Sequence, residues 1–118
     1  MKYFQTKKEN YNKGRQGEGV ALEYLVKKGF GLVEKNYENI LGEIDLIMID
    51  KNWLVFVEVK YKTDDFLGLP EEMINKNKVY RIRKIAESYV FLNRPKQEKY
   101  RIDAVCILGN QIRHYENI

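Results

Sequence analysis

Two apolar stretches joined by a short polar turn constrain the fold of this chain more than any other feature. The first runs from Ile44 to Ile49 and the second from Trp53 to Lys60. Both are rich in the β-branched and aromatic residues that favour strands. Asp50-Lys51-Asn52 between them has the chemistry of a turn. The pattern therefore predicts two antiparallel strands joined as a hairpin, on which the rest of the chain has to pack.

The remaining elements are predicted from the spacing of apolar residues and from turn signals. Gly29 stands where a helix-ending glycine is expected. In chain order these elements are a helix over residues 14–28, a strand over 32–38, a loop over 62–70, an amphipathic helix from about 74 to 93, a central strand over 101–108 and a short edge strand over 111–115.

This order of elements predicts the α/β class, with a mixed β-sheet and helices packed on it. Residues 1–12 are polar and rich in Lys and Asn, so we expect a flexible N-terminal arm there and a single domain over residues 13–118. Cys106 is the only cysteine, which excludes a disulfide framework and predicts an inert core thiol.

Composition gives weaker information about function and location. The N-terminus lacks the apolar region of a signal peptide, and no apolar run is long enough to span a bilayer. We therefore expect a cytoplasmic protein without a membrane partner. A net charge of +4 and a pI near 9.1 favour polyanions but identify none.

Charged residues interrupt the two hairpin strands. Asp45 lies in an otherwise apolar strand, where it shares a face with Glu43. In the partner strand Glu58 and Lys60 share a face. Carboxylates in such a place lose hydration, and two of them repel each other unless a cation lies between them.

This set of residues suits hydrolysis of a phosphodiester. Magnesium takes oxygen ligands, and Asp45, Glu58 and the Val59 carbonyl could supply three. Lys60 could then position or activate the attacking water. The alternative is that the same residues are strand-end charges that face solvent or form an ion pair. Spacing alone does not decide between these interpretations.

Two further residues stand on the apolar stripes of the predicted helices. Glu18 shares a stripe with Ala21, Leu22 and Leu25, so it is either a further ligand or a complement to the helix dipole. Lys78 begins the stripe of the second long helix, where it either reaches a scissile phosphate or extends along the surface to solvent.

Basic residues surround Lys78, and they either neutralise backbone phosphates or form a solvated helix face. They are Lys76, Arg81, Arg83 and Lys84, with Tyr80 among them. His114 is predicted to be an edge-strand residue rather than a general base. Gly14 and Gly17 lack the preceding strand that a phosphate-binding glycine loop requires.

The segment Gly42-Glu43-Ile44-Asp45-Leu46-Ile47, followed by Phe56-Val57-Glu58-Val59-Lys60, resembles the YraN-type family of small bacterial proteins. That family belongs to the restriction-endonuclease-like superfamily, with its Asp…Glu-x-Lys signature, and is similar to archaeal Holliday junction resolvases. The resemblance covers nearly the whole chain. It extends through Gly14-Arg15, Gly17-Glu18, Gly29-Phe30, Asn36-Tyr37, Phe66, Gly68, Pro70, Lys78, Ala86, Tyr89, Arg101 and Asp103.

The resemblance implies a restriction-endonuclease-like αβββαβ core. It implies that Asp45, Glu58 and Lys60 are the catalytic positions, and that Glu18 matches the acid that the first helix contributes in resolvase-like members. Ile44 replaces the proline of the superfamily motif, which is not a metal ligand.

Residues and resemblance together lead us to expect an endonuclease that uses Mg²⁺ or Mn²⁺ to hydrolyse DNA, including branched or single-stranded forms. The metal ligands would be Glu18, Asp45, Glu58 and Val59, with Glu43 a lesser candidate. DNA contacts are expected from Arg15, Lys62, Lys78 and Arg81. No small-molecule cofactor is expected, and a homodimer is left open because junction resolvases cut as symmetric pairs. The alternative function is a nucleic-acid-binding or partner-binding module with little nuclease activity.

Overall fold

The computed structural model describes residues 7–118, with side chains from Gly14 onward. One five-stranded sheet runs in chain order from β1 to β5, with β3 and β4 parallel and every other neighbouring pair antiparallel. The predicted α/β class, with a mixed sheet and packed helices, is confirmed. The elements are α1 (Lys7–Lys27), β1 (Gly31–Asn39), β2 (Gly42–Asp50), β3 (Trp53–Lys62), the 3₁₀ helix η1 (Pro70–Met73), α2 (Lys76–Asn93), β4 (Lys99–Leu108) and β5 (Gln111–Tyr115).

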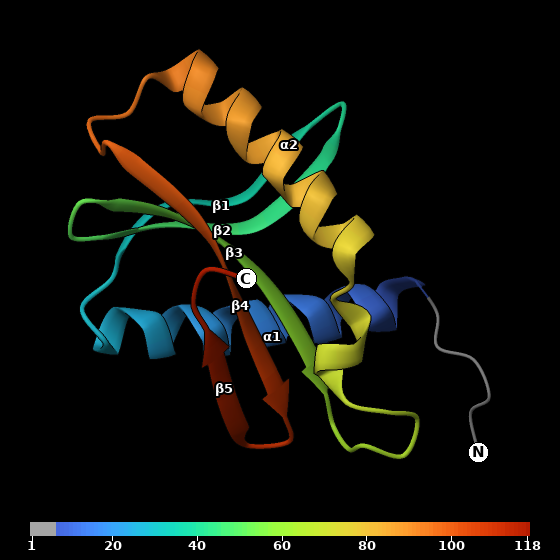
Figure 1. Ribbon diagram of the computed structural model, residues 1–118. Helices are drawn as coiled ribbons and strands as arrows, with labels where there is room; N and C mark the ends of the chain where they lie inside the picture. The colour runs from blue at the N-terminus through green and yellow to red at the C-terminus, as the bar shows by residue number, and fades with distance from the viewer. Residues whose placement is uncertain (1–6) are drawn as a thin grey trace.

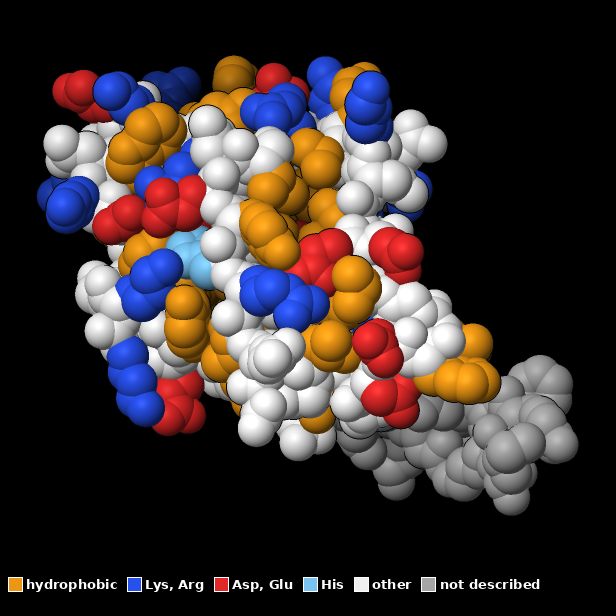
Figure 2. Space-filling view, turned by 60° about the horizontal axis from the view of Figure 1, so that its bottom comes forward, with side chains coloured by type: hydrophobic (Ala, Val, Ile, Leu, Met, Phe, Trp, Pro, Cys, Tyr) orange, Lys and Arg blue, Asp and Glu red, His pale blue; other side chains and the backbone are white. Residues whose placement is uncertain are grey.

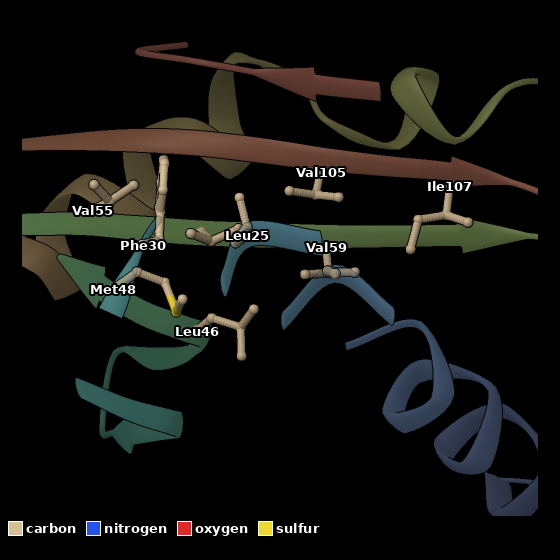
Figure 3. Packing of buried hydrophobic residues seen from close by; sticks show 10 residues of the cluster. Leu25, Phe30, Leu46, Met48, Val55, Val59, Val105 and Ile107 are labelled. Carbon is tan, nitrogen blue, oxygen red and sulfur yellow. The ribbon is translucent and has the colours of Figure 1, made fainter. Parts of the chain in front are cut away.

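The two long helices cover opposite faces of the sheet (Figure 1). On one face Ala21 and Leu25 of α1 pack against the strands, in a cluster that includes Leu46, Met48 and Val105 (Figure 3). On the other face an apolar stripe of α2 packs on the strands and forms a second cluster with them. Its members are Ile44, Ile47, Leu54, Phe56, Ile82, Ile85, Ala86, Tyr89 and Ile102.

The alternation of β3 decides where its charged residues lie. Val55, Val57 and Val59 belong to the cluster under α1, whereas Leu54 and Phe56 belong to the cluster under α2. Because side chains of a strand alternate between faces, Glu58 and Lys60 continue the row that faces α2. An ion pair between Lys78 of α2 and Glu58 agrees with this placement.

Some element boundaries differ from the prediction. Helix α1 begins at Lys7, earlier than predicted. The prediction missed its first turns because the residues upstream of Gly14 show no apolar spacing. Of the predicted arm over residues 1–12, residues 1–6 lie outside the described part of the chain, and the backbone of the rest is helical. Helix α2 begins at Lys76, because the Asn75 side chain caps it by accepting a hydrogen bond from the Lys78 amide at 2.9 Å.

Two expectations about the core and the membrane can be compared with the structure. Cys106 is buried, and burial raises the pKa of its thiol to about 11, so the thiol stays protonated at neutral pH. This agrees with the predicted inert core residue.

From Lys7 to Ile118, neither long helix combines the length and the apolar character that crossing a bilayer requires.

Candidate metal centre

Strands β2 and β3 separate at Asp45. Their pairing runs from Asp50↔Trp53 to Leu46↔Val57, while β3 itself continues to Lys62. Beyond the last pair, the Val59 amide donates to Oδ2 of Asp45 at 2.8 Å. The Asp45 side chain therefore occupies the opening between the strands and takes a hydrogen bond that a continued ladder would give to backbone.

Three carboxylates gather at this opening. Glu18 comes from α1, and Glu43 and Asp45 come from β2; one oxygen of each lies within 4.8 Å of the other two. Asn36 of β1 donates to Oε1 of Glu18 at 2.6 Å and to Oε1 of Glu43 at 3.1 Å. Nη1 of Arg15 lies 3.0 Å from Oε1 of Glu18. The structure thus brings the predicted Glu18 and Glu43 to Asp45.

A close contact between α1 and β3 makes this placement of Glu18 possible. Gly17 is buried, and a Cβ added to it would lie 2.8 Å from Cβ of Tyr61. Real Cβ atoms do not approach a neighbour so closely, so only glycine fits here without a shift of the helix. The next residue, Glu18, then reaches the opening.

Glu58 is the most deeply buried carboxylate of the centre, with 3% of its surface exposed. Nζ of Lys78 lies 3.1 Å from Oε2 of Glu58, and Nζ of Lys60 lies 3.9 Å from the same oxygen. Neither ammonium is oriented to donate a hydrogen bond, and within the described residues this Oε2 is buried without a hydrogen-bond partner. The two ion pairs balance its charge, while its capacity to accept a hydrogen bond or to bind a cation is left for a further group.

The pKa of Asp45 is raised to about 9, although part of the residue reaches solvent. Burial is the largest cause, the neighbouring Glu58 carboxyl is the second, and Glu18 adds to both. The hydrogen bond from the Val59 amide acts in the opposite direction without compensating them. Without a cation, Asp45 therefore keeps its proton at neutral pH.

The donor set fits a hard divalent cation. The side-chain donors at the opening are carboxylate oxygens, which Mg²⁺ and Mn²⁺ prefer. The unsatisfied Oε2 of Glu58 and the proton held on Asp45 are both consistent with acids gathered for a positive charge. The Val59 amide donates to Asp45, and the Val59 side chain packs in the cluster under α1. That the Val59 carbonyl binds the metal stays a prediction.

The four residues expected to contact DNA lie in different surroundings. Arg15 is paired with Glu18, and Lys78 points to Glu58 instead of extending to solvent. Nζ of Lys62 donates to the carbonyls of Leu67 at 3.3 Å and Gly68 at 3.2 Å, so it holds the loop after β3. Arg81 is exposed on α2.

Asn36 belongs to the family pattern, but its role at this site was not predicted. Its φ of 54° lies in the left-handed region, which Asn tolerates better than most residues. A polar residue of this type inside a predicted strand is the signal that could have indicated an irregular, functional position.

His114 lies in the edge strand, as predicted, but its surroundings were not foreseen. It belongs to the edge strand β5, but its ring is buried, with Nε2 2.8 Å from Oδ2 of Asp103. Asp103, His114 and Glu116 form a second group of metal-type donors. Asp103 already accepts hydrogen bonds from Arg101 and the Asn117 amide, so this group is a structural network.

Comparison with known proteins agrees with the family expected from the motifs. A sequence profile described as "Uncharacterised protein family UPF0102" matches residues 17–107, which contain the whole candidate centre. The chain belongs to this family. UPF0102 is the YraN-type family that the sequence resembles.

Bacterial members of UPF0102 are similar to the chain over most of its length. A member from Thermodesulfovibrio yellowstonii is 38% identical over 104 residues, covering 88% of this chain and 92% of the relative. One from Persephonella marina is 39% identical over 105 residues, covering 89% and 90%. One from Caldanaerobacter subterraneus is 45% identical over 97 residues, covering 82% and 80%. These relatives carry only the family name, so the reaction has to be argued from the site.

Proposed function

We propose that this protein is a metal-dependent endonuclease that hydrolyses phosphodiester bonds of DNA. One observation carries the proposal: the carboxylates of Glu18, Glu43 and Asp45 meet beside the unsatisfied Oε2 of Glu58 and two lysine ammonium groups. Buried acids destabilise a fold unless they are paired with positive groups, hold a cation or serve a reaction. The combination of clustered acids and adjacent lysines fits phosphoryl chemistry.

Asp45, Glu58 and Glu18 would hold the cation, with Glu43 and the Val59 carbonyl as further donors. When bound, Mg²⁺ or Mn²⁺ lowers the pKa of water and offsets negative charge on the phosphate. Asp45 has to give up its proton before it can act as a ligand, because its pKa is raised to about 9 in the free protein.

The two lysines beside Glu58 would act on the substrate in different ways. Lys60 of β3 would orient the attacking water and balance charge that develops on the phosphate. Lys78 of α2 would neutralise a phosphate oxygen. Both ammonium groups now lie within 4.0 Å of Glu58, so each is already held beside the reaction centre.

In the proposed function, a few basic residues near the centre would bind the DNA backbone, rather than one broad positive surface. Blue, red and orange side chains interleave on the face drawn in Figure 2, without a broad area of one charge. On α2 the basic residues Lys76, Arg81, Arg83 and Lys84 are all exposed. In the proposed function these residues would neutralise phosphates of a strand that reaches Lys78.

The first prediction concerns Lys60. The protein should cleave DNA with Mg²⁺ or Mn²⁺, in a screen of duplex, single-stranded and branched substrates, and chelation should stop the reaction. Lys60→Ala should slow cleavage by roughly 100- to 1,000-fold, because a single oriented charge at a reaction centre contributes that much. The matched control is Lys99→Ala, which removes an exposed lysine beside Trp53 at the opposite end of the sheet. Cleavage that Lys60→Ala leaves unchanged would contradict the mechanism.

A second candidate is a module that binds nucleic acid and cuts little. It is favoured by Asn36 and Arg15, which satisfy Glu18 and Glu43 without a cation. This candidate predicts DNA binding that weakens steeply with salt and no metal-dependent turnover on any substrate of the screen.

A further inference from the structure

A cavity of about 610 Å³ opens on the α2 side of the sheet. Val79 and Tyr80 of α2 line it on the helix side, Ala104 and Cys106 of β4 form the floor, and Tyr115 of β5 also lines it. Its volume is in the range of sites that enclose a small organic group. The candidate metal centre does not use this cavity.

The floor of the cavity adjoins the candidate centre. In the parallel pairing of β3 with β4, Ala104 is the partner of Glu58 and Cys106 is the partner of Lys60. Neighbouring strands lie about 4.8 Å apart. On α2, Lys78 stands between Lys76 and Val79, which both line the cavity. A group seated in the cavity is therefore one strand away from the residues that would act on the phosphate.

The lining is mainly apolar and aromatic, with basic residues among its members. Tyr80 is 61% exposed and Tyr115 is 40% exposed, so parts of both rings remain open to a ligand. Lys76 and Arg83 line the same cavity, and Nζ of Lys84 lies 5.2 Å from the centroid of the Tyr80 ring. A flat aromatic ligand carried on an anionic backbone matches this combination.

The carboxylate in the lining does not oppose an anion. Glu71 accepts a hydrogen bond from Nη2 of Arg113 at 3.0 Å and from the Tyr115 hydroxyl at 2.8 Å. Its charge is thereby matched by Arg113, while Lys76 and Arg83 add positive charge to the lining.

We propose that this cavity receives an unpaired base of the strand to be cut, next to the scissile phosphate. This inference rests on the proposed function and names its substrate class. Bases inside a duplex are stacked and paired, so one must leave the stack to enter a pocket. The preferred substrates are therefore strands with an unpaired nucleotide at the cut, such as single strands, bulges and flaps, rather than intact duplex.

The test is a binding cycle in chelator, so that cleavage does not enter. The probes are a labelled DNA duplex with a one-nucleotide bulge, the same duplex with an abasic bulge, and the fully paired duplex; bulged RNA is a further arm. The proteins are wild type, Tyr80→Ala and the control Phe91→Ala. Phe91 is an exposed aromatic residue further along α2, outside the cavity.

Wild type should bind the bulged base more tightly than the abasic bulge or the paired duplex. Tyr80→Ala should weaken binding of the bulged base by about 5- to 100-fold, the usual range for loss of one stacking residue. The same variant should leave the abasic probe unchanged, and Phe91→Ala should behave as wild type. A circular-dichroism melt confirms that each variant folds.

Other results would overturn the inference. Equal losses on the normal and abasic bulges would assign Tyr80 to backbone binding, and equal affinity of wild type for all probes would leave the cavity without a base. No binding, with a change in self-association of Tyr80→Ala, would make the cavity an interface between copies. If no substrate is cleaved in the screen but binding still depends on the unpaired base, the proposed nuclease function is wrong and the base site is supported.

Discussion

Asp45 is the residue at which stability and the proposed reaction conflict most directly. Its carboxyl lies between the Glu58 and Glu18 carboxyls, and it accepts the Val59 amide where β2 leaves β3. A neutral amide of the same shape could keep that hydrogen bond at every pH, whereas Asp45 has to hold a proton to stay uncharged. The native residue is therefore better suited to binding a cation than to stabilising the metal-free fold.

A pH-dependent gain in stability is predicted for Asp45→Asn in metal-free protein. Because the pKa of Asp45 is raised from 3.8 to about 9, the folded state holds its proton more tightly than the unfolded state. The favourable contribution of Asp45 to the free energy of unfolding is full below pH 4 and is lost as the pH rises towards 9. The advantage of Asn should therefore grow between pH 5 and pH 8, by up to about 1.4 kcal/mol per pH unit. Urea unfolding at both pH values measures it.

Asp65→Asn, in the exposed loop after β3, is the control for removal of one acid. The difference in free energy of unfolding between this variant and wild type should be the same at both pH values. An Asp45→Asn variant that is less stable at pH 8 than at pH 5, relative to wild type, would show that burial does not raise the pKa of Asp45.

The sequence revealed some site residues and not others for a physical reason. Asp45 and Glu58 stand out because a charge inside an apolar strand is visible within a few residues. Asn36 acts by bridging Glu18 and Glu43, which come from other elements. Lys78 was a candidate from its place on a helical stripe, but its contact with Glu58 depends on how α2 crosses the sheet. Contacts between distant segments leave no local pattern in a single sequence.

At the scale of elements, the contact of α1 with β3 determines where Glu18 lies. Alternating and helical spacings predicted each long element, because a buried face imposes its period on the sequence. The end of the β2–β3 pairing at Leu46↔Val57 was not predicted, although Asp45 and Glu58, the charged residues that interrupt the apolar pattern, lie directly beyond that pair. That separation creates the opening in which the acids meet.

Opposite stability effects are predicted for two glycines of α1. Gly17→Ala should lower the free energy of unfolding by about 1–3 kcal/mol, because the new methyl group would meet Cβ of Tyr61 at 2.8 Å and force the helix away from the sheet. Gly19→Ala meets no atom within 4 Å and should raise stability by about 0.5–1 kcal/mol through helix propensity. Thermal unfolding of both variants checks the pair.

Gly17→Ala should also slow cleavage, because Glu18 moves with the helix, whereas Gly19→Ala should not. Equal stabilisation by both alanines would mean that α1 does not approach β3 as closely as Gly17 and Tyr61 indicate.

Across the whole molecule, a buried ionic network around Arg101 joins distant parts of the chain. Arg101 donates to Asp103 and to Asp50 of β2, and Asp103 accepts the Asn117 amide near the C-terminus. Burial by itself would raise the pKa of Asp103, but hydrogen bonds from His114 and Arg101 outweigh burial and hold it below its ordinary value. The network therefore has a structural role that is separate from the candidate centre.

Asp103→Asn should destabilise the fold by about 3–5 kcal/mol at pH 7, because it leaves the buried Arg101 without its main counter-charge. A lowered pKa means that the contribution of Asp103 is full above pH 4 and is lost as the pH falls below it. The gap between wild type and variant should therefore narrow in acid. Chemical unfolding at pH 7 and pH 3.5 measures the gap, and a gap that widens in acid would contradict the assignment.

The claim that the acids around Asp45 form a divalent-metal centre is tested most directly by titrating the protein with Mn²⁺ in a calorimeter. We predict saturable binding at pH 7 that is lost in Asp45→Asn and weakens as the pH falls, because a proton on Asp45 competes with the cation. Glu116→Gln, in the second group of donors, should bind as wild type does. Mn²⁺ binding that survives Asp45→Asn, or that disappears in Glu116→Gln, would contradict this account of the centre.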